Sequence, residues 1–168
     1  MTIEPLQLPT LQLLVLAESA PQIDGYRVRG TDDRQWLTDR PLVERLRFRA
    51  EAYTRFELGP REAVPALQDD LALPAGFNPR TLAWAAALRA DPTNANADAR
   101  TLAQRVLRHI REGGYTYTLA PGEYGRDAVD EFWLDRKEGF CEHFSAAFVV
   151  VMRALGVPAR IATGYQGT

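Results

Sequence analysis

The stretch that decides the fold runs from Gly139 to Gly156 and reads Gly139-Phe-Cys-Glu-His-Phe-Ser-Ala-Ala-Phe-Val-Val-Val-Met-Arg-Ala-Leu-Gly156. Large apolar residues recur in it at spacings of four, three and four, which is the period of one helix face: Phe144, Phe148, Val151 and Leu155. Gly156 is a helix stop, and Val157-Pro158 prevents continuation. The spacing therefore predicts a helix with a buried face that begins near Cys141.

Cys141 falls in the first turn of this helix and is the only cysteine of the chain. Unpaired amides and the positive end of the helix dipole stabilise a thiolate, which is the reactive form. Cys141 shares a stripe with Phe144, so we expect its side chain to point toward the protein body, where a nucleophile meets partners from other elements. The alternative is a buried structural cysteine that packs as a small hydrophobe.

The chain has two histidines, and neither is placed well for catalysis. His143 follows Cys141 by two positions, which turns its side chain about 200° away along a helix. We expect it to be packed or hydrogen-bonded at the helix start. His109 lies beside the apolar stripe of an earlier helix and is expected to be a satisfied boundary residue. A metal site of Cys141, His143 and His109 would lack a specified fourth ligand, so we expect no metal and no cofactor.

Before Asn78 the sequence is strand-like. Leu46–Tyr53 alternates strictly between apolar and charged or small residues, Leu11–Ala17 is a short apolar run, and Tyr26–Arg29 also alternates. Asp24-Gly25 supplies turn chemistry between these runs. From Leu6 to about Leu73 the pattern predicts strands of an antiparallel β unit, and we assign this unit to residues 1–76.

From Asn78 the period changes to that of helices. Asn78 is a predicted N-cap, and Pro79 suits the first helical position. The remaining expected elements follow in order: a helix within Leu82–Ala90, an interruption at Asp91–Asn96, a helix over Asp98–Glu112, a strand at Tyr115–Leu119, one or two helical turns at Asp130–Leu134, and a strand at Ala159–Tyr165. The stripe of the second helix comprises Ala99, Leu102, Ala103, Val106, Leu107 and Ile110. Residues 77–168 form the second predicted domain.

Composition excludes several classes of function. The formal net charge is −2 over 168 residues, so no basic field points to nucleic acid. The better explanation of three nearby arginines is that they form the solvent-exposed face of one strand: Arg45, Arg47 and Arg49. The longest nearly apolar run, Phe144–Met152, is far shorter than the roughly 20 residues of a membrane-spanning helix.

The run Gly139–Phe148, followed by Met152–Gly167, resembles the core motif of transglutaminase-like proteins, and more narrowly of their bacterial, membrane-anchored TgpA-type subgroup. Asp98–Leu119 and Asp127–Leu134 fit the same subgroup, and Val43–Arg49 fits it more weakly. The resemblance implies an α+β fold, in which an N-terminal antiparallel β unit precedes helices and the first half of a papain-like cysteine core. It also implies that Cys141 is the catalytic nucleophile.

The implied reaction is acyl transfer. The thiolate attacks a glutamine-type amide of a protein or peptide substrate, forms a thioester, and passes the acyl group to an amine or to water. No cofactor is implied. Members of the subgroup are embedded in the bacterial inner membrane through other segments. The resemblance therefore implies that this soluble region faces the periplasm, outside the cytoplasmic membrane.

One difference between this chain and the family pattern bears on activity. In the family, the catalytic His and Asp follow the segment that corresponds to Gly164–Gly167, whereas this chain ends at Thr168. We therefore expect the 168-residue chain to lack turnover, and the Ala159–Tyr165 strand to fray or to pair with the N-terminal unit. Two alternatives stay open: a cysteine protease or amidase with the same core, and a non-enzymatic extracytoplasmic binding or scaffolding module in which Cys141 is a relic.

Overall fold

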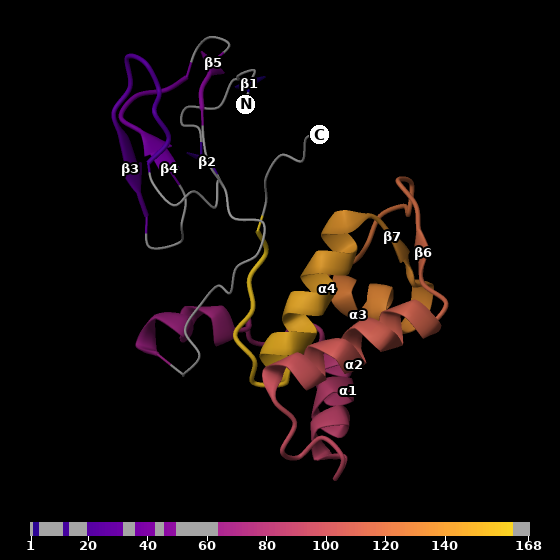
Figure 1. Ribbon diagram of the computed structural model, residues 1–168. Coiled ribbons are helices and arrows are strands. Elements are labelled where there is room, and N and C mark those ends of the chain that lie inside the picture. The colour runs from indigo at the N-terminus through magenta and orange to yellow at the C-terminus, as the bar shows by residue number, and fades with distance from the viewer. Residues whose placement is uncertain are drawn as a thin grey trace. The chain divides into compact units, whose positions relative to one another are not determined.

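The computed structural model describes residues 2–3, 12–13, 20–31, 36–42, 46–49 and 64–162. The chain divides into two compact units, one within Met1–Gly59 and one over Pro60–Ile161 (Figure 1). Short antiparallel strands make up the first unit, and helices dominate the second. The fold class is α+β, as the sequence predicted.

The described residues of the first unit form two small antiparallel sheets. One pairs β1 (Thr2–Ile3) with β5 (Leu46–Arg47), and the other has the order β2-β4-β3, formed by Gln12–Leu13, Trp36–Thr38 and Val28–Gly30. Gly25 adopts φ +77° in the predicted turn. Phe48 packs with Ile23 and Leu42, while Arg47 is exposed, so the predicted alternation holds where the structure describes it. Most of the predicted strand at 11–17, and residues 50–53 of the other, lie outside the described residues.

The strand-like prediction fails near its C-terminal end. Pro65–Leu67 and Asp69–Leu71 are short 3-10 helices. Pro65 fixes a helical φ at the first helical position, and Asp69 has low strand propensity. The Arg153 guanidinium donates to the carbonyl of Ala72 at 2.7 Å, and this contact ties the segment to the end of a later helix.

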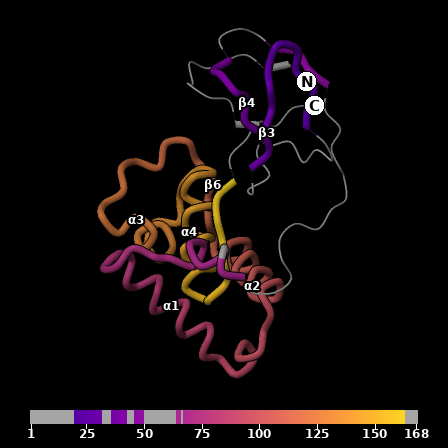
Figure 2. Tube along the Cα trace, turned by 90° about the vertical axis from the view of Figure 1, so that its left-hand side faces the viewer, coloured from indigo at the N-terminus to yellow at the C-terminus, as the bar shows by residue number. Residues whose placement is uncertain are grey.

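The second unit is built around one central helix, α4. Its elements in order are α1 (Pro79–Ala90), α2 (Ala99–Glu112), β6 (Thr116–Tyr117), α3 (Ala128–Asp130), a π-helix (Glu131–Arg136), β7 (Glu138–Gly139) and α4 (Cys141–Ala154). Helix α4 packs against α1, α2 and α3 (Figures 1 and 2). The buried core comprises Ala85, Leu102, Val106, Phe132, Trp133, Ala147, Val151, Met152 and Leu155. No helix in the described ranges is long and apolar enough to cross a membrane.

The predicted helices are present, and their apolar stripes are only partly buried. On α2, Leu102 and Val106 are buried, whereas Ala99 and Leu107 are exposed. On α4, the predicted residues Val151 and Leu155 are buried, but Phe144 and Phe148 are half-buried. The core therefore contacts the second half of α4 more closely than its first turn.

The predicted strand Ala159–Tyr165 is not formed over Ala159–Ala162. The N–H of Ala159 donates to the Asp70 carbonyl at 3.0 Å, and its own carbonyl accepts from Arg153 Nε at 2.7 Å. Because both backbone groups of Ala159 bond inside this unit, they are not available to a strand ladder. Residues 163–165 lie outside the described residues, so the expected pairing with the N-terminal unit stays a prediction.

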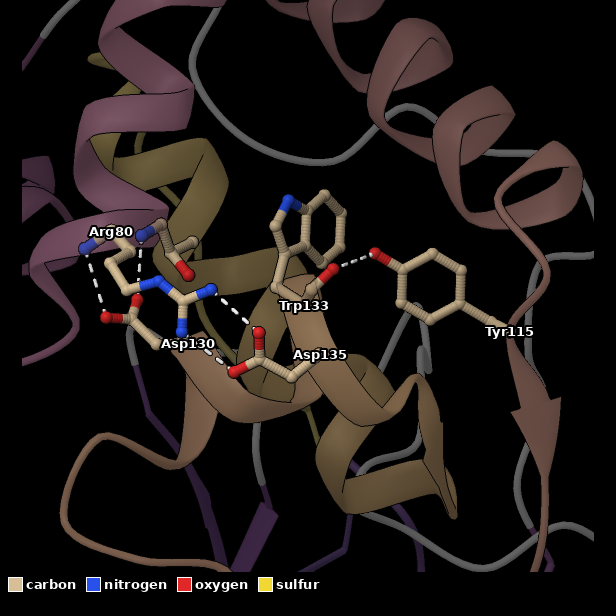
Figure 3. Close-up of polar contacts among 6 residues, drawn as sticks. Arg80, Tyr115, Asp130, Trp133 and Asp135 are labelled. Atoms are coloured by element: carbon tan, nitrogen blue, oxygen red, sulfur yellow. Dashed lines mark hydrogen bonds and ion pairs between the residues drawn. The ribbon is translucent and has the colours of Figure 1, made fainter.

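Helices α1 and α3 cap each other. The buried carboxylate of Asp130, 3% exposed, accepts the N–H of Thr81 at 2.7 Å and of Arg80 at 3.0 Å, in the first turn of α1 (Figure 3). In return, Asn78 Oδ1 accepts the N–H of Val129 at 3.0 Å. Asn78 is the N-cap of α1, as predicted, but its side chain caps α3, because its left-handed backbone (φ +53°) directs the amide away from its own helix.

We expect Asp130→Ala to lower the free energy of unfolding of the second unit by about 2–3 kcal/mol, because two buried N–H groups lose a charged acceptor. Asp135→Ala is the matched control. It removes a bidentate but exposed ion pair to the same Arg80 and should cost much less. Urea unfolding followed by tryptophan fluorescence measures both. Equal losses would contradict the capping role.

Candidate active site

Cys141 is the first residue of α4, and its side chain is exposed. The alternative of a buried structural cysteine does not fit this exposure. The expectation that the side chain points toward the protein body stays a prediction. Burial increases along the helix, from exposed Cys141 and Glu142 to fully buried Ala147. The first turn of α4 extends beyond the core that covers its later turns, so the shared stripe does not bury the thiol.

The backbone before Cys141 is held by strand β6. The π-helix ends at Lys137, which adopts φ +57°. Strand β7 then runs parallel to β6: the N–H of Thr116 donates to the Lys137 carbonyl, and that of Thr118 donates to the Gly139 carbonyl, each at 2.8 Å. Sequence reasoning missed this pairing, because a two-residue strand carries no periodic signal.

His143 supports the start of α4. Its Nδ1 accepts the backbone N–H of Phe140 at 3.4 Å, and its ring lies 4.8 Å from the Tyr124 ring between centroids. A Cβ at Gly139 would stand 2.7 Å from the His143 Cβ, so only glycine permits this approach. The prediction that His143 is packed and hydrogen-bonded at the helix start is confirmed.

His109 lies half-buried in an aromatic cluster. Its ring stacks on Trp133 with centroids 4.9 Å apart and lies 4.7 Å from Trp84, while Nε2 is 3.2 Å from Tyr115 Oη. Burial, and then the positive charge of Lys137, lower the pKa of His109. The ring is satisfied by these contacts, which confirms it as a boundary residue.

A side chain of α4 hydrogen-bonds to the backbone of its own first turn. Ser145 Oγ donates to the Cys141 carbonyl at 2.7 Å, and Glu142 adds an exposed carboxylate at the positive end of the helix. Across the described ranges, no three His, Cys, Asp or Glu side chains cluster as metal ligands would. Chemically, the arrangement offers one accessible sulfur nucleophile at a helix N-terminus.

These features, a cysteine at the head of a core helix in an α+β fold, agree with a family match. The model of the transglutaminase-like superfamily matches residues 83–168. The chain belongs to the transglutaminase-like superfamily.

Particular relatives agree with this assignment. The chain is 34% identical over 163 residues to a protein-glutamine γ-glutamyltransferase of Pseudomonas aeruginosa, a match that covers 95% of this chain and 23% of that protein. Over 39 residues, 23% of this chain and 5% of the relative, it is 49% identical to YebA, an uncharacterized protein of Bacillus subtilis.

Two solved structures extend the match to the fold. Both are crystal structures of the periplasmic domain of TgpA from Pseudomonas aeruginosa, one of them bound to ethylmercury. They match with TM-scores of 0.79 and 0.80 at 32% and 31% identity, over 99% of this chain and 57% and 55% of those chains. The chain thus spans little more than half of the solved domain and under a quarter of the transferase.

We expect His109 to make stability depend on pH. A histidine whose pKa is lower in the folded state disfavours folding once the unfolded chain protonates, below the ordinary pKa of 6.5. The free energy of unfolding should therefore fall as the pH decreases from 7.5 to 5.5. His109→Gln keeps an N–H donor for Tyr115 and should flatten this dependence, measured by urea titration at each pH. An unchanged slope in the variant would assign the dependence to other groups.

Proposed function

We propose that the chain is part of a transglutaminase-like acyltransferase in which Cys141 is the nucleophile. The observation that carries the proposal is the exposed thiol on the first residue of α4, in a chain whose second half matches the family. In this proposal, the second unit, which the family model matches, belongs to the catalytic core, and the short strands of the first unit belong to a preceding β unit.

The reaction follows from the position of the thiol. The Cys141 thiolate attacks the side-chain carboxamide carbon of a glutamine, and the C–N bond breaks with release of ammonia, which takes up a proton. The resulting thioester is attacked by an amine, which yields a new amide and returns the thiol, or by water, which yields a glutamate. The free N–H groups of the first turn, the Cys141 amide among them, are suited to stabilise the oxyanion.

Neither histidine of the chain serves as the base in this proposal. His109 is enclosed by aromatic rings, and His143 uses Nδ1 to hold the Phe140 amide. The family supplies its His and Asp from later strands, so the proposed reaction depends on groups beyond those described. Similarity to the Pseudomonas protein-glutamine transferase and to the solved periplasmic domains supports protein glutamine as substrate and a periplasmic location. A membrane-embedded parent is proposed only from the sequence resemblance to the membrane-anchored subgroup.

We expect one equivalent of ethylmercury or iodoacetamide to modify the native 168-residue chain, and none to modify Cys141→Ser. A thiolate binds the mercury of ethylmercury and displaces iodide from iodoacetamide, and Cys141 is exposed. Mass spectrometry before and after unfolding in urea measures the stoichiometry. Modification only in urea would contradict an accessible nucleophile.

A second prediction concerns turnover. We expect the 168-residue chain to incorporate no fluorescent primary amine into a glutamine-bearing protein, because its base is missing. A longer product that contains this segment and the family's His and Asp should incorporate the amine, and Cys141→Ser should lower that rate at least about 10³-fold. Glu142→Gln is the neighbouring control and should retain activity. Ammonia release without amine incorporation would indicate an amidase, and Cys141-independent transfer would contradict the proposal.

A further inference from the structure

The hydroxyl of Tyr115 has a defined orientation. It donates to the Trp133 carbonyl at 2.7 Å (Figure 3). His109 Nε2 lies 3.2 Å from the same hydroxyl oxygen. A carbonyl can only accept, so the hydroxyl proton points to Trp133, and His109 must donate its Nε2–H to the hydroxyl. A relay of two hydrogen bonds therefore runs from α2 to the π-helix.

The Trp133 carbonyl needs this donor because of how the π-helix ends. The N–H of Lys137 donates to the Phe132 carbonyl at 3.1 Å, one residue earlier than an α-helix would use, and the chain then leaves the helix with Lys137 left-handed. Trp133 is fully buried. A buried carbonyl without a donor is costly, and the Tyr115 hydroxyl removes that cost.

The residues that follow Tyr115 also hold, through backbone hydrogen bonds, the residues that precede Cys141. Directly after Tyr115, the N–H groups of Thr116 and Thr118 hold the Lys137 and Gly139 carbonyls. The Lys137 ammonium in turn donates to the Gly113 carbonyl at 3.0 Å, just before Tyr115. Tyr115 thus joins the end of the π-helix to the segment that pairs with the backbone in front of Cys141, beside the Lys137 ammonium and the Tyr124 hydroxyl, which donates to the Glu138 carbonyl.

We propose that Tyr115 is a positioning residue for Cys141: its hydroxyl, oriented by His109, fixes the end of the π-helix and through it the start of α4. This inference rests on the proposed function, in which Cys141 is the nucleophile. In the described part of the chain, Lys137 is the one cation beside the Tyr115–His109 pair. Its ammonium lies 5.6 Å from the centre of the Tyr115 ring. Burial raises the pKa of Tyr115, so the hydroxyl keeps its proton and goes on donating.

The test compares Tyr115→Phe with Tyr117→Phe in the 168-residue chain. Each variant removes one tyrosine hydroxyl, and the two tyrosines lie two positions apart in the same segment. Tyr117 differs in being 61% exposed. In Tyr115→Phe we expect amide hydrogen exchange to become about tenfold faster at Thr116, Thr118 and Lys137, because local opening becomes easier. The α2 amides of Leu102 and Val106 should change less than about twofold. Tyr117→Phe should change neither set.

The second readout is the rate of Cys141 modification by iodoacetamide under native conditions at pH 7. We expect a change of about threefold or more in Tyr115→Phe and none in Tyr117→Phe. Acceleration spread evenly over α2 and β6 would show general destabilisation and overturn the proposal, as would local acceleration with an unchanged Cys141 rate.

If Tyr115→Phe does not fold, His109→Phe removes only the donor to the hydroxyl and is read in the same way, with His109→Gln as the variant that restores an N–H. Neither readout needs turnover. A failure of acyl transfer in the longer product would therefore leave these results interpretable, and a failure of positioning would leave the transfer assay unaffected.

Discussion

The buried carboxylate of Asp130 is the constraint on which the second unit depends. A helix N-terminus leaves N–H groups without partners, and such an end enters a core only if acceptors come with it. The Asp130 carboxylate accepts two N–H groups of α1, and the Asn78 side chain accepts an N–H group of α3, so each helix end supplies acceptors for the backbone of the other. Phe132 and Trp133, the largest buried residues of the core, come two and three positions after Asp130, so this pair of caps helps to place them.

Long, positively charged side chains connect other parts of this unit through hydrogen bonds to backbone carbonyls. Arg136 donates to the Glu123 carbonyl at 2.6 Å and stacks on Tyr124, Lys137 donates to the Gly113 carbonyl, and Arg153 donates to the Ala72 carbonyl. Charge-assisted hydrogen bonds of this kind are stronger than neutral ones. They hold the irregular segments around α4 in a unit whose described sheet has only two short strands.

The helices of this unit could be predicted because their signals are local: the Asn78-Pro79 start of α1, the Gly156 stop after α4, and apolar residues at helical spacing. Helical turns at Asp130–Leu134 were also predicted, but their π-helical form was not. The β6–β7 pairing and the failure of the strand at Ala159 could not be predicted either, because they depend on partners distant in sequence. The position of Cys141 at the helix start was predictable for the same local reason. Its exposure was not, because a stripe shows which residues share a face and not how far along the helix the core extends.

The three residues that sequence chemistry singled out end in three different environments, and this difference limits what the site can do. The imidazole of His109 is enclosed by Trp84, Trp133 and Tyr115, where protonation is disfavoured, and His143 spends a ring nitrogen on the backbone before α4. Of the three, only Cys141 is exposed. Both imidazoles are engaged with other parts of the unit. In the proposed acyl transfer, the base therefore comes from neither of them.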